Sequence, residues 1–237
     1  MGVVVALVCA LLIGGVSFRL RGPYFALATI AFAEVLRLIA KNLPEVTGGD
    51  VGVQVPALFH GNVNRAFYWA AVALTTLASA TTVAISRARF GYYLMAIRED
   101  EDTALSVGIG ASRNKLAALL ISAALTALAG ALYGSLFLYI VPDQVLAIDV
   151  SNEIAIVAML GGAGTVLGPI VGAVVLESAA EVFKNIFKEA HLLIYGLLLV
   201  VVVLFLPEGI IGTIAKFLRR RELLSGAKTG AKGVAAG

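Results

Sequence analysis

Chemically reactive side chains are scarce in this sequence. Of its 237 residues, one is cysteine, two are histidine, and only 14% carry a charge. A single cysteine, Cys9, allows neither an internal disulfide nor a cysteine-based zinc site. The histidines, His60 and His191, lack the spacing of a metal site. The sequence therefore predicts no metal and no cofactor.

The sequence motifs of several enzyme classes are also missing. No G-x4-G-K-[ST] phosphate loop occurs, and "GAKTGAKG" near the C-terminus has the wrong spacing. Neither H-E-x-x-H nor G-x-S-x-G is present. The sequence predicts a protein that is not an enzyme and has no ATPase site of its own. A net charge of +3, carried mostly by loops and the tail, does not indicate nucleic-acid binding.

Apolar residues, by contrast, make up 60% of the chain. A helix needs roughly 20 mostly apolar residues to cross the hydrocarbon core of a bilayer. The predicted fold class is all-α, with a polytopic transmembrane bundle over residues 1–215. A basic tail follows, 216–237, whose first basic residues suit anionic lipid headgroups and whose remainder is expected to be disordered. The predicted helices cover about 3–16, 23–40, 66–86, 115–140, 153–183 and 191–206.

The fifth apolar run contains a glycine-rich interruption, "LGGAGTVLGP". Glycine costs about 1 kcal/mol inside a helix and proline about 3 kcal/mol, so the run is predicted to be broken. Two uses of this break remain open. It lines a substrate path or gate, or it is a helix-packing seam in which Gly164, Gly168 and Gly172 recur every four residues. The candidate path residues are Gly161, Gly162, Gly164, Gly168 and Pro169.

The distribution of basic residues predicts which side each connection faces, because Lys and Arg accumulate on the cytoplasmic side. If residues 18–22, 87–115 and the tail are cytoplasmic, 13 of the 18 Lys and Arg residues lie inside. This arrangement requires the run 153–183 to be re-entrant, entering and leaving on one side. A single crossing would leave 9 basic residues inside against 8 outside, and the bias would vanish.

The connection 87–114 carries an unusual charged cluster, "REDED". From Asp100 the pattern predicts a short helix, with acids at its start, Glu99 to Asp102, and with Gly108 or Gly110 at its end. Ala104 and Gly108 would share one smooth face that a partner protein could approach. The alternative is a solvated charge run on an ordinary connecting helix. Ser112 is predicted to cap the next helix.

Ionisable residues are rare within the apolar runs, and two of them, Glu34 and Arg37, lie three apart on one predicted helix. They are placed to form a structural ion pair. A role in the substrate path or gate is the alternative, because charges within a membrane are costly. The nearby "TGGD", from Thr47, is predicted to form a turn on the outer side.

The charged segment has a familiar form. "DTALSVG" resembles a degenerate EAA-x3-G loop of ABC-importer permeases. Ala104 and Gly108 match that motif, whereas Asp102 stands in place of its Glu and Thr103 in place of its first Ala. The order of "GPYFALATIAFAEVLRLI", "TGGDVG", "GYYLMAIREDEDTALSVGI", "AGALYG", "LGGAGTVLGPIVGA" and "LFLPEGIIG" is similar to that in branched-chain amino-acid permeases of the LivM type. The resemblance covers residues 18–221, nearly the whole chain.

This resemblance implies a function and partners. It implies a multi-pass permease subunit in a bacterial or archaeal plasma membrane, with a cytoplasmic C-terminus. Its coupling helix, with Glu99, Asp102, Ala104 and Gly108, would dock on separate ATPase subunits. A second homologous permease subunit, a periplasmic solute-binding protein and membrane lipids complete the expected partners. Such permeases usually have further N-terminal helices, so this chain is expected to be a shorter form or a fragment.

Other classes of function fit the residues less well. An ion-gradient-driven secondary transporter or channel would also use broken helices, but the chain shows no repeated half. An intramembrane enzyme lacks its motifs, and a purely structural subunit remains open for a truncated chain.

Overall fold

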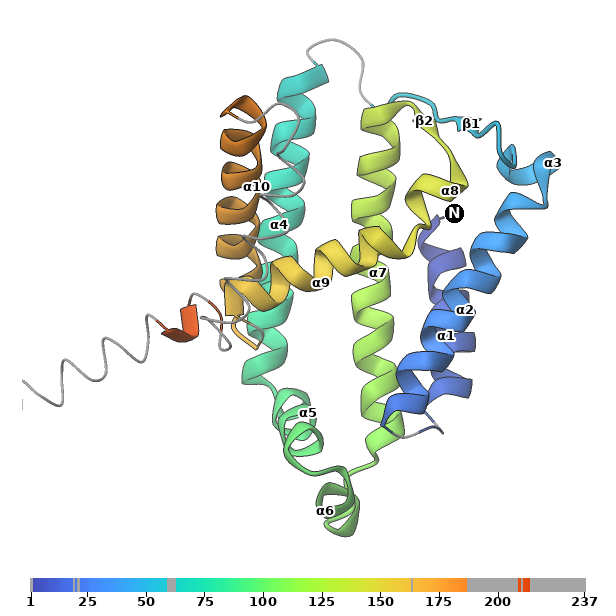
Figure 1. The fold of residues 1–237 in the computed structure, drawn as a ribbon. Coiled ribbons are helices and arrows are strands. Elements are labelled where there is room, and N and C mark those ends of the chain that lie inside the picture. Colours follow the sequence, from blue (N-terminus) through green and yellow to red (C-terminus); the bar gives the residue numbers. More distant parts are fainter. Residues whose placement is uncertain are drawn as a thin grey trace, which may run out of the picture. The chain divides into compact units, whose positions relative to one another are not determined.

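The apolar runs form helices in the computed structural model (Figure 1), which describes residues 2–18, 20, 22–58, 63–162, 164–186, 209 and 211–213. The all-α class is confirmed, and the described strands are limited to one short pair. The chain forms two compact units, Met1–Val150 and Ser151–Gly237, which are described separately. The predicted helix 191–206 and the tail 216–237 lie outside the described residues.

The elements follow one another along the chain with short connections. The first unit contains α1 (Gly2–Ser17), α2 (Pro23–Lys41), α3 (Pro44–Thr47), β1 (Val53–Gln54), α4 (Val63–Arg87), α5 (Arg89–Glu99), α6 (Glu101–Ser106), α7 (Ala111–Phe137), β2 (Tyr139–Ile140) and α8 (Pro142–Val145). Helix α9 (Ile148–Gly162) begins at the end of this unit and continues into the second, which also holds α10 (Gly168–Ile186).

Three helical segments of the described chain are long and apolar enough to cross a membrane, by length and composition. They are α4, α7 and the stretch Pro142–Gly162, which joins α8 to α9. The shorter α1 is also apolar, with 16 residues. Most of the large apolar side chains of α1 are exposed within this chain, as in a helix that faces lipid or a partner.

Helix α1 packs along α7, and a glycine permits the close approach. A Cβ on Gly14 would lie 2.5 Å from Leu116 Cδ1 and 3.2 Å from Leu119 Cδ2. The N-cap of α7 is Gly110, without a side-chain hydrogen bond, so the prediction that Ser112 caps this helix is wrong. The helix ends at Phe137, and its C-cap Leu138 has a left-handed φ of 60° and an N–H that donates to the Gly134 carbonyl.

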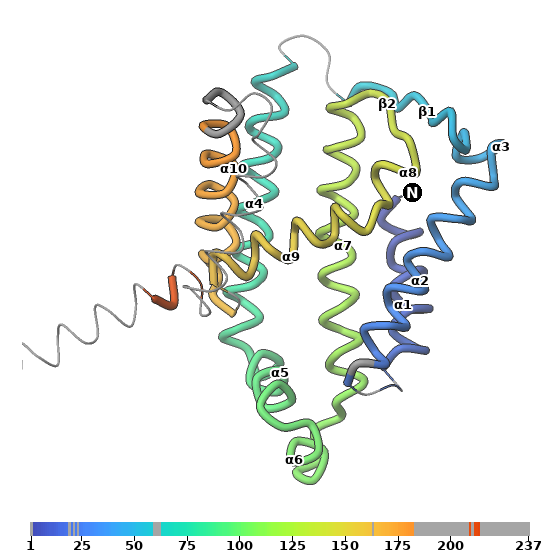
Figure 2. The backbone as a smooth tube through the Cα atoms, in the orientation of Figure 1, coloured from blue at the N-terminus to red at the C-terminus, as the bar shows by residue number. Residues whose placement is uncertain are grey.

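The first unit has two ends that matter for the site (Figure 2). At the α6 end, the α1–α2 connection meets α6 and α7 around a pocket of about 160 Å³. Its lining residues are Phe18, Leu20, Gly22, Phe25, Glu101 and Lys115. The distribution of basic residues assigned the α1–α2 connection and the connection 87–114, which contains α6, to one side of the membrane. Both lie at the same end of the first unit.

The opposite end, named the α8 end, holds α3, α8 and the strands. Strands β1 and β2 pair antiparallel, with Val53 opposite Ile140 and Gln54 opposite Tyr139. The Val55 N–H also donates to the Leu138 carbonyl, at 2.9 Å. Residues 141–152, which separate two predicted helices, contain α8 and the start of α9.

In the second unit, the predicted break is present between α9 and α10. The chain turns after Gly162, with φ values of 123° at Gly162 and 95° at Gly164. Thr165 closes the turn, since both its N–H and its hydroxyl donate to the Gly162 carbonyl. Pro169 lies in the first turn of α10, where a helix tolerates proline because no intrahelical N–H bond is lost.

Candidate functional site

The helix predicted within the charged cluster is α6, and both of its ends are capped. Asp100 is the N-cap, and its carboxylate accepts a hydrogen bond from the Thr103 N–H at 2.6 Å. This backbone hydrogen bond lowers the pKa of Asp100 below its ordinary value of 3.8. At the other end, Gly108 has a φ of 87°. The Gly108 N–H donates to Leu105 and the Ile109 N–H to Ala104, which is a Schellman motif.

The face of α6 that carries Ala104 is not open to a partner, contrary to the sequence-based interpretation. Ala104 is only 3% exposed and forms a small apolar cluster with Ile97 of α5 and Ala111 of α7. Ile109 packs against the same cluster. The small side chain is needed because α6 lies close against its own neighbours. The face of α6 available for docking is the opposite one.

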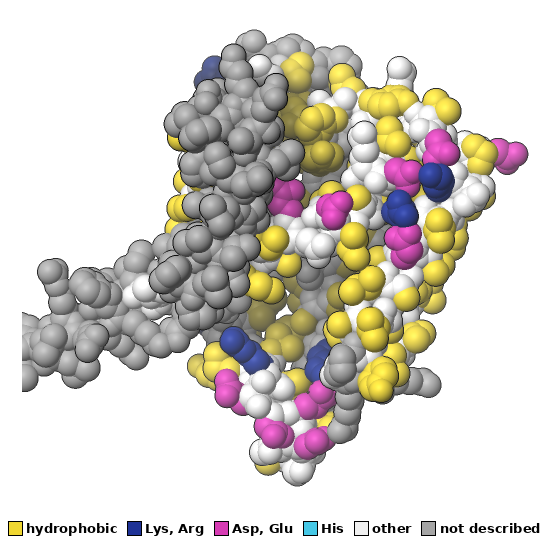
Figure 3. Space-filling view, viewed as in Figure 1, with side chains coloured by type: hydrophobic (Ala, Val, Ile, Leu, Met, Phe, Trp, Pro, Cys, Tyr) yellow, Lys and Arg dark blue, Asp and Glu magenta, His cyan; other side chains and the backbone are white. Residues whose placement is uncertain are grey.

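An ion pair adds a second attachment between α6 and α7. Lys115 Nζ donates to Glu101 Oε2 at 2.6 Å, and each side chain is 31% exposed. Glu99 ends α5 and is exposed, while Asp102 lies exposed in the first turn of α6. Val107, just after α6, is 72% exposed. On the visible face, charged side chains gather at this end (Figure 3).

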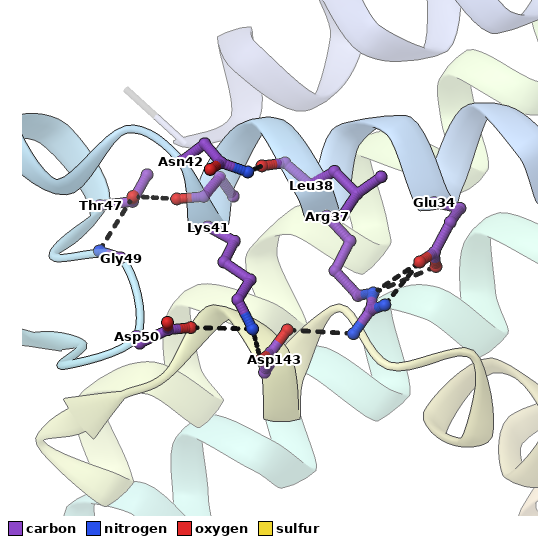
Figure 4. A network of polar contacts seen from close by, with 10 residues as sticks. Glu34, Arg37, Leu38, Lys41, Asn42, Thr47, Gly49, Asp50 and Asp143 are labelled. Carbon is purple, nitrogen blue, oxygen red and sulfur yellow. Dashed lines mark hydrogen bonds and ion pairs between the residues drawn. The ribbon is translucent and has the colours of Figure 1, made fainter.

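At the α8 end, Glu34 and Arg37 pair as expected, but they belong to a larger network (Figure 4). Arg37 Nε donates to Glu34 Oε2 at 3.1 Å, and Arg37 Nη1 donates to Asp143 Oδ1 at 3.0 Å. Lys41 Nζ lies 2.9 Å from Asp143 Oδ2 and 3.0 Å from Asp50 Oδ1. Five charges thus join α2, the loop after α3 and α8.

Asp143 was not predicted from the sequence as a partner of Arg37 and Lys41. It lies 106 residues from Arg37, and no helical or strand periodicity connects them. If residues 18–22, 87–115 and the tail are cytoplasmic, Lys41 and Asp143 both fall on the outer side of the membrane. A shared side of the membrane does not identify a contact.

The "TGGDVG" segment is folded tightly against the end of α2, which explains its glycines. Gly48, Gly49 and Gly52 have φ values of 70°, 55° and 81°, in the region that favours glycine. A Cβ on Gly52 would lie 2.6 Å from the Ile140 carbonyl oxygen. The Thr47 hydroxyl donates to the carbonyls of Ala40 and Leu43. This loop places Asp50 beside Lys41.

In the second unit, glycines bring the backbones of α9 and α10 into contact. A Cβ on Gly172 would lie 2.9 Å from the Gly161 nitrogen, and a Cβ on Gly161 would collide with the Gly168 carbonyl. The packing seam therefore uses Gly161, Gly168 and Gly172. Gly164 is exposed in the turn, so the seam expected at Gly164, Gly168 and Gly172 is corrected at its first member.

A further glycine, Gly209, completes this contact and was not singled out from the sequence. It is buried, with a φ of 75°. A Cβ there would lie 2.5 Å from the Gly162 nitrogen and 2.8 Å from the Met159 carbonyl oxygen. Its signal was present in "PEGIIG", where a glycine follows an apolar run. The role of these glycines in a substrate path or gate stays a prediction.

These features define an α-helical membrane protein with a capped connecting helix, α6, at one end of its first unit and a broken helix in its second. The chain belongs to the family described as branched-chain amino acid transport system / permease component, whose model matches residues 1–203. No solved structure matches the chain.

Curated relatives agree with this family. The high-affinity branched-chain amino acid transport system permease protein LivM of Salmonella typhimurium is 29% identical over 84% of this chain and 53% of its own length. The probable LivM of Methanocaldococcus jannaschii is 22% identical, over 89% and 67%. LivH of Escherichia coli is 27% identical, over 75% and 61%. The chain spans about half the length of the Salmonella LivM protein.

Proposed function

We propose that this chain is a permease subunit of an ABC importer that moves branched-chain, aliphatic amino acids across a bacterial or archaeal plasma membrane. The family membership supports the class of transporter. The substrate is inferred from the relatives LivM and LivH, which are permease proteins of branched-chain amino acid transport systems. Separate ATPase subunits, a second homologous permease subunit and a periplasmic solute-binding protein are the proposed partners. The C-terminus is proposed to be cytoplasmic.

The geometry of α6 is the observation that supports this function best. The helix has six residues, is capped by Asp100 and Gly108, and is fastened to α7 by Ala104 and by the Glu101–Lys115 pair. A short helix held this firmly moves together with α7. An ATPase that pulls on the exposed side of α6 would therefore displace a helix long enough to cross the membrane.

Glu99, Asp102, Ala104 and Gly108 have different roles in this proposal. Ala104 and Gly108 shape and attach the coupling helix, through burial and a left-handed φ. Glu99, Asp102 and Val107 belong to the exposed side that meets the ATPase. The seam glycines of α9 and α10 are proposed to hold the broken helix rigid where it borders the substrate path, and Glu34 and Arg37 to belong to a structural network at the other end.

A pair of matched substitutions tests the docking surface. Val107→Arg places a long charged side chain beside α6, where Val107 is 72% exposed. We expect this variant to lose ATPase subunits on purification, by about tenfold or more, because an unpaired charge is buried on docking. Val46→Arg is the control, since Val46 is 76% exposed at the α8 end. Quantifying co-purified ATPase subunits from membranes that express the complete system distinguishes the two.

Gly108→Arg is a weaker test of docking, because its φ of 87° makes any side chain there strain the end of α6. Normal ATPase retention by Val107→Arg would contradict the assignment of this surface. Uptake that follows an ion gradient and ignores ATP depletion would instead favour a secondary transporter.

A further inference from the structure

One carboxylate at the α8 end serves two cations from the same helix. Arg37 and Lys41 are four residues apart on α2, so they project from one face. Asp143 Oδ1 accepts from Arg37 Nη1 at 3.0 Å, while Oδ2 accepts from Lys41 Nζ at 2.9 Å. Both oxygens are therefore engaged across elements that are more than 100 residues apart in sequence.

The three acids of this network differ in what they attach. Glu34 lies on α2 itself, and Asp50 lies in the loop that directly follows α3. Asp143 alone among them belongs to α8. Removing its charge would leave Arg37 paired with Glu34 and Lys41 paired with Asp50, so α2 would keep its partners. The ionic attachment of α8 would be the part that is lost.

Helix α8 depends on such an attachment because it is short. It has four residues, Pro142–Val145, which is too few for a helix to be stable alone. The pairing of β1 with β2 holds the chain up to Ile140 without any ionic side chain. Beyond α8, only Leu146 and Ala147 precede α9. The position of α8 therefore sets where the next long helix begins.

We propose that Asp143 is a positioning residue whose carboxylate holds α8 against the end of α2 and so keeps the α8 end of the first unit closed. The ion pairs of Asp143 with Arg37 and Lys41 are named the clasp. The ion pairs lie at the surface of this chain, since the side chains of Arg37 and Asp143 are 30% and 34% exposed. Exposed ion pairs break and re-form at little cost, which suits a contact that must open. For transport, which rests on the proposed function, the clasp restrains opening towards the side that delivers substrate.

A simpler role for Asp143 must be separated from this one. It lies in the first turn of α8, where an acid also favours the helix dipole. That local effect would not depend on the cations of α2. Lys41→Gln removes a partner on α2 and leaves α8 unchanged in sequence. The clasp predicts that Lys41→Gln loosens α8, whereas the local effect predicts no change there.

Hydrogen–deuterium exchange of the α8 amides tests the clasp directly. The N–H groups of Gln144, Val145 and Leu146 donate to the carbonyls of Val141 and Pro142, so their exchange reports opening of α8. We expect Asp143→Asn and Lys41→Gln each to speed exchange of these amides by about two- to fivefold, the range for partly exposed ion pairs. Asp143→Glu should restore part of the protection. Asp149→Asn, an exposed acid at the start of α9, is the control and should change nothing.

The transport role has its own measurement in the reconstituted transporter. Asp143→Asn should raise ATP hydrolysis in the absence of substrate, and Asp143→Glu should reverse the rise. The clasp is overturned if the α8 amides of Asp143→Asn exchange at the unaltered rate. It is also overturned if their exchange is faster in Asp143→Asn but not in Lys41→Gln. Faster exchange with unchanged substrate-free hydrolysis overturns its role in transport. Faster exchange in a chain that never retains an ATPase leaves the clasp intact and contradicts the proposed function instead.

Discussion

At the scale of single residues, the sequence was most informative where one side chain acts on its own neighbours. The start of α6 at Asp100 and its end at Gly108 were both predictable, because capping depends on residues within one turn. The Glu34–Arg37 pair was predictable for the same reason. Ala104 was misread, because a small residue suits a tight contact inside the chain as well as one with a partner. Only the burial of Ala104 against Ile97 and Ala111 shows that its contact lies inside the chain and not with a partner.

The carboxylate of Asp100 makes one prediction about pH. Its pKa is lowered in the folded chain by the hydrogen bond from the Thr103 N–H. A depressed pKa stabilises α6 above the ordinary value of 3.8, and this contribution is lost as the pH falls through the lower folded value. The Thr103 amide signal in NMR should therefore titrate below pH 3.8.

Asp100→Asn is the matched variant for this titration. Asparagine keeps an oxygen that can cap α6 but has no charge to lose. We expect the Thr103 signal of this variant to show no titration in the acidic range while α6 remains formed. A titration with the same midpoint in both proteins would assign the proton to another group.

At the scale of elements, glycine patterns predicted a break and a seam but not the partners within the seam. Four-residue spacing suggested Gly164 with Gly168 and Gly172, as for one continuous helix face. The chain turns after Gly162, so Gly161 of α9 lies against Gly168 and Gly172 of α10 instead. Periodicity describes a helix that continues, and it gives no information about contacts across a turn.

Neighbouring glycines on α1 offer a controlled test of close packing. A Cβ at Gly14 would meet Leu116 of α7 at 2.5 Å, whereas a Cβ at Gly15 meets nothing within 4 Å. Gly14→Leu should overpack the α1–α7 contact and cost about 1–3 kcal/mol. Gly15→Leu should be tolerated. Thermal unfolding in detergent, compared between the two variants, measures the difference, and equal stabilities would contradict the packing of α1 on α7.

At the scale of the whole molecule, composition alone identified an all-α membrane protein, because an apolar content of 60% leaves few other folds. The order of motifs indicated the family, which the match over residues 1–203 confirms. The contacts of Asp143 and Gly209 were not predicted, since both join segments distant in sequence and no local pattern identifies such a partner. The sidedness of the connections stays a prediction from basic residues.

Labelling from one side of the membrane tests that sidedness. Because Cys9 is the only cysteine, Cys9→Ser provides a background without thiols. In this background, Val46→Cys should react with an impermeant maleimide added outside the cell. Lys188→Cys should react in the same way, because the distribution of basic residues predicts that Lys188 lies on the outer side. Val107→Cys should react only after permeabilisation. Reaction of Val107→Cys from outside would reverse the topology and remove α6 from contact with any cytoplasmic ATPase.

Helix α7 connects the two ends of the first unit without interruption. Its 27 residues make a rod about 40 Å long, with Ala111 and Lys115 beside α6 and Gly134 beside Ile140 of β2. A tilt of about 5° around one tip swings the far tip by about 3 to 4 Å over that length. In the proposed transporter, α7 would therefore act as a lever arm: a small displacement of α6 by an ATPase would move the α8 end by several ångströms.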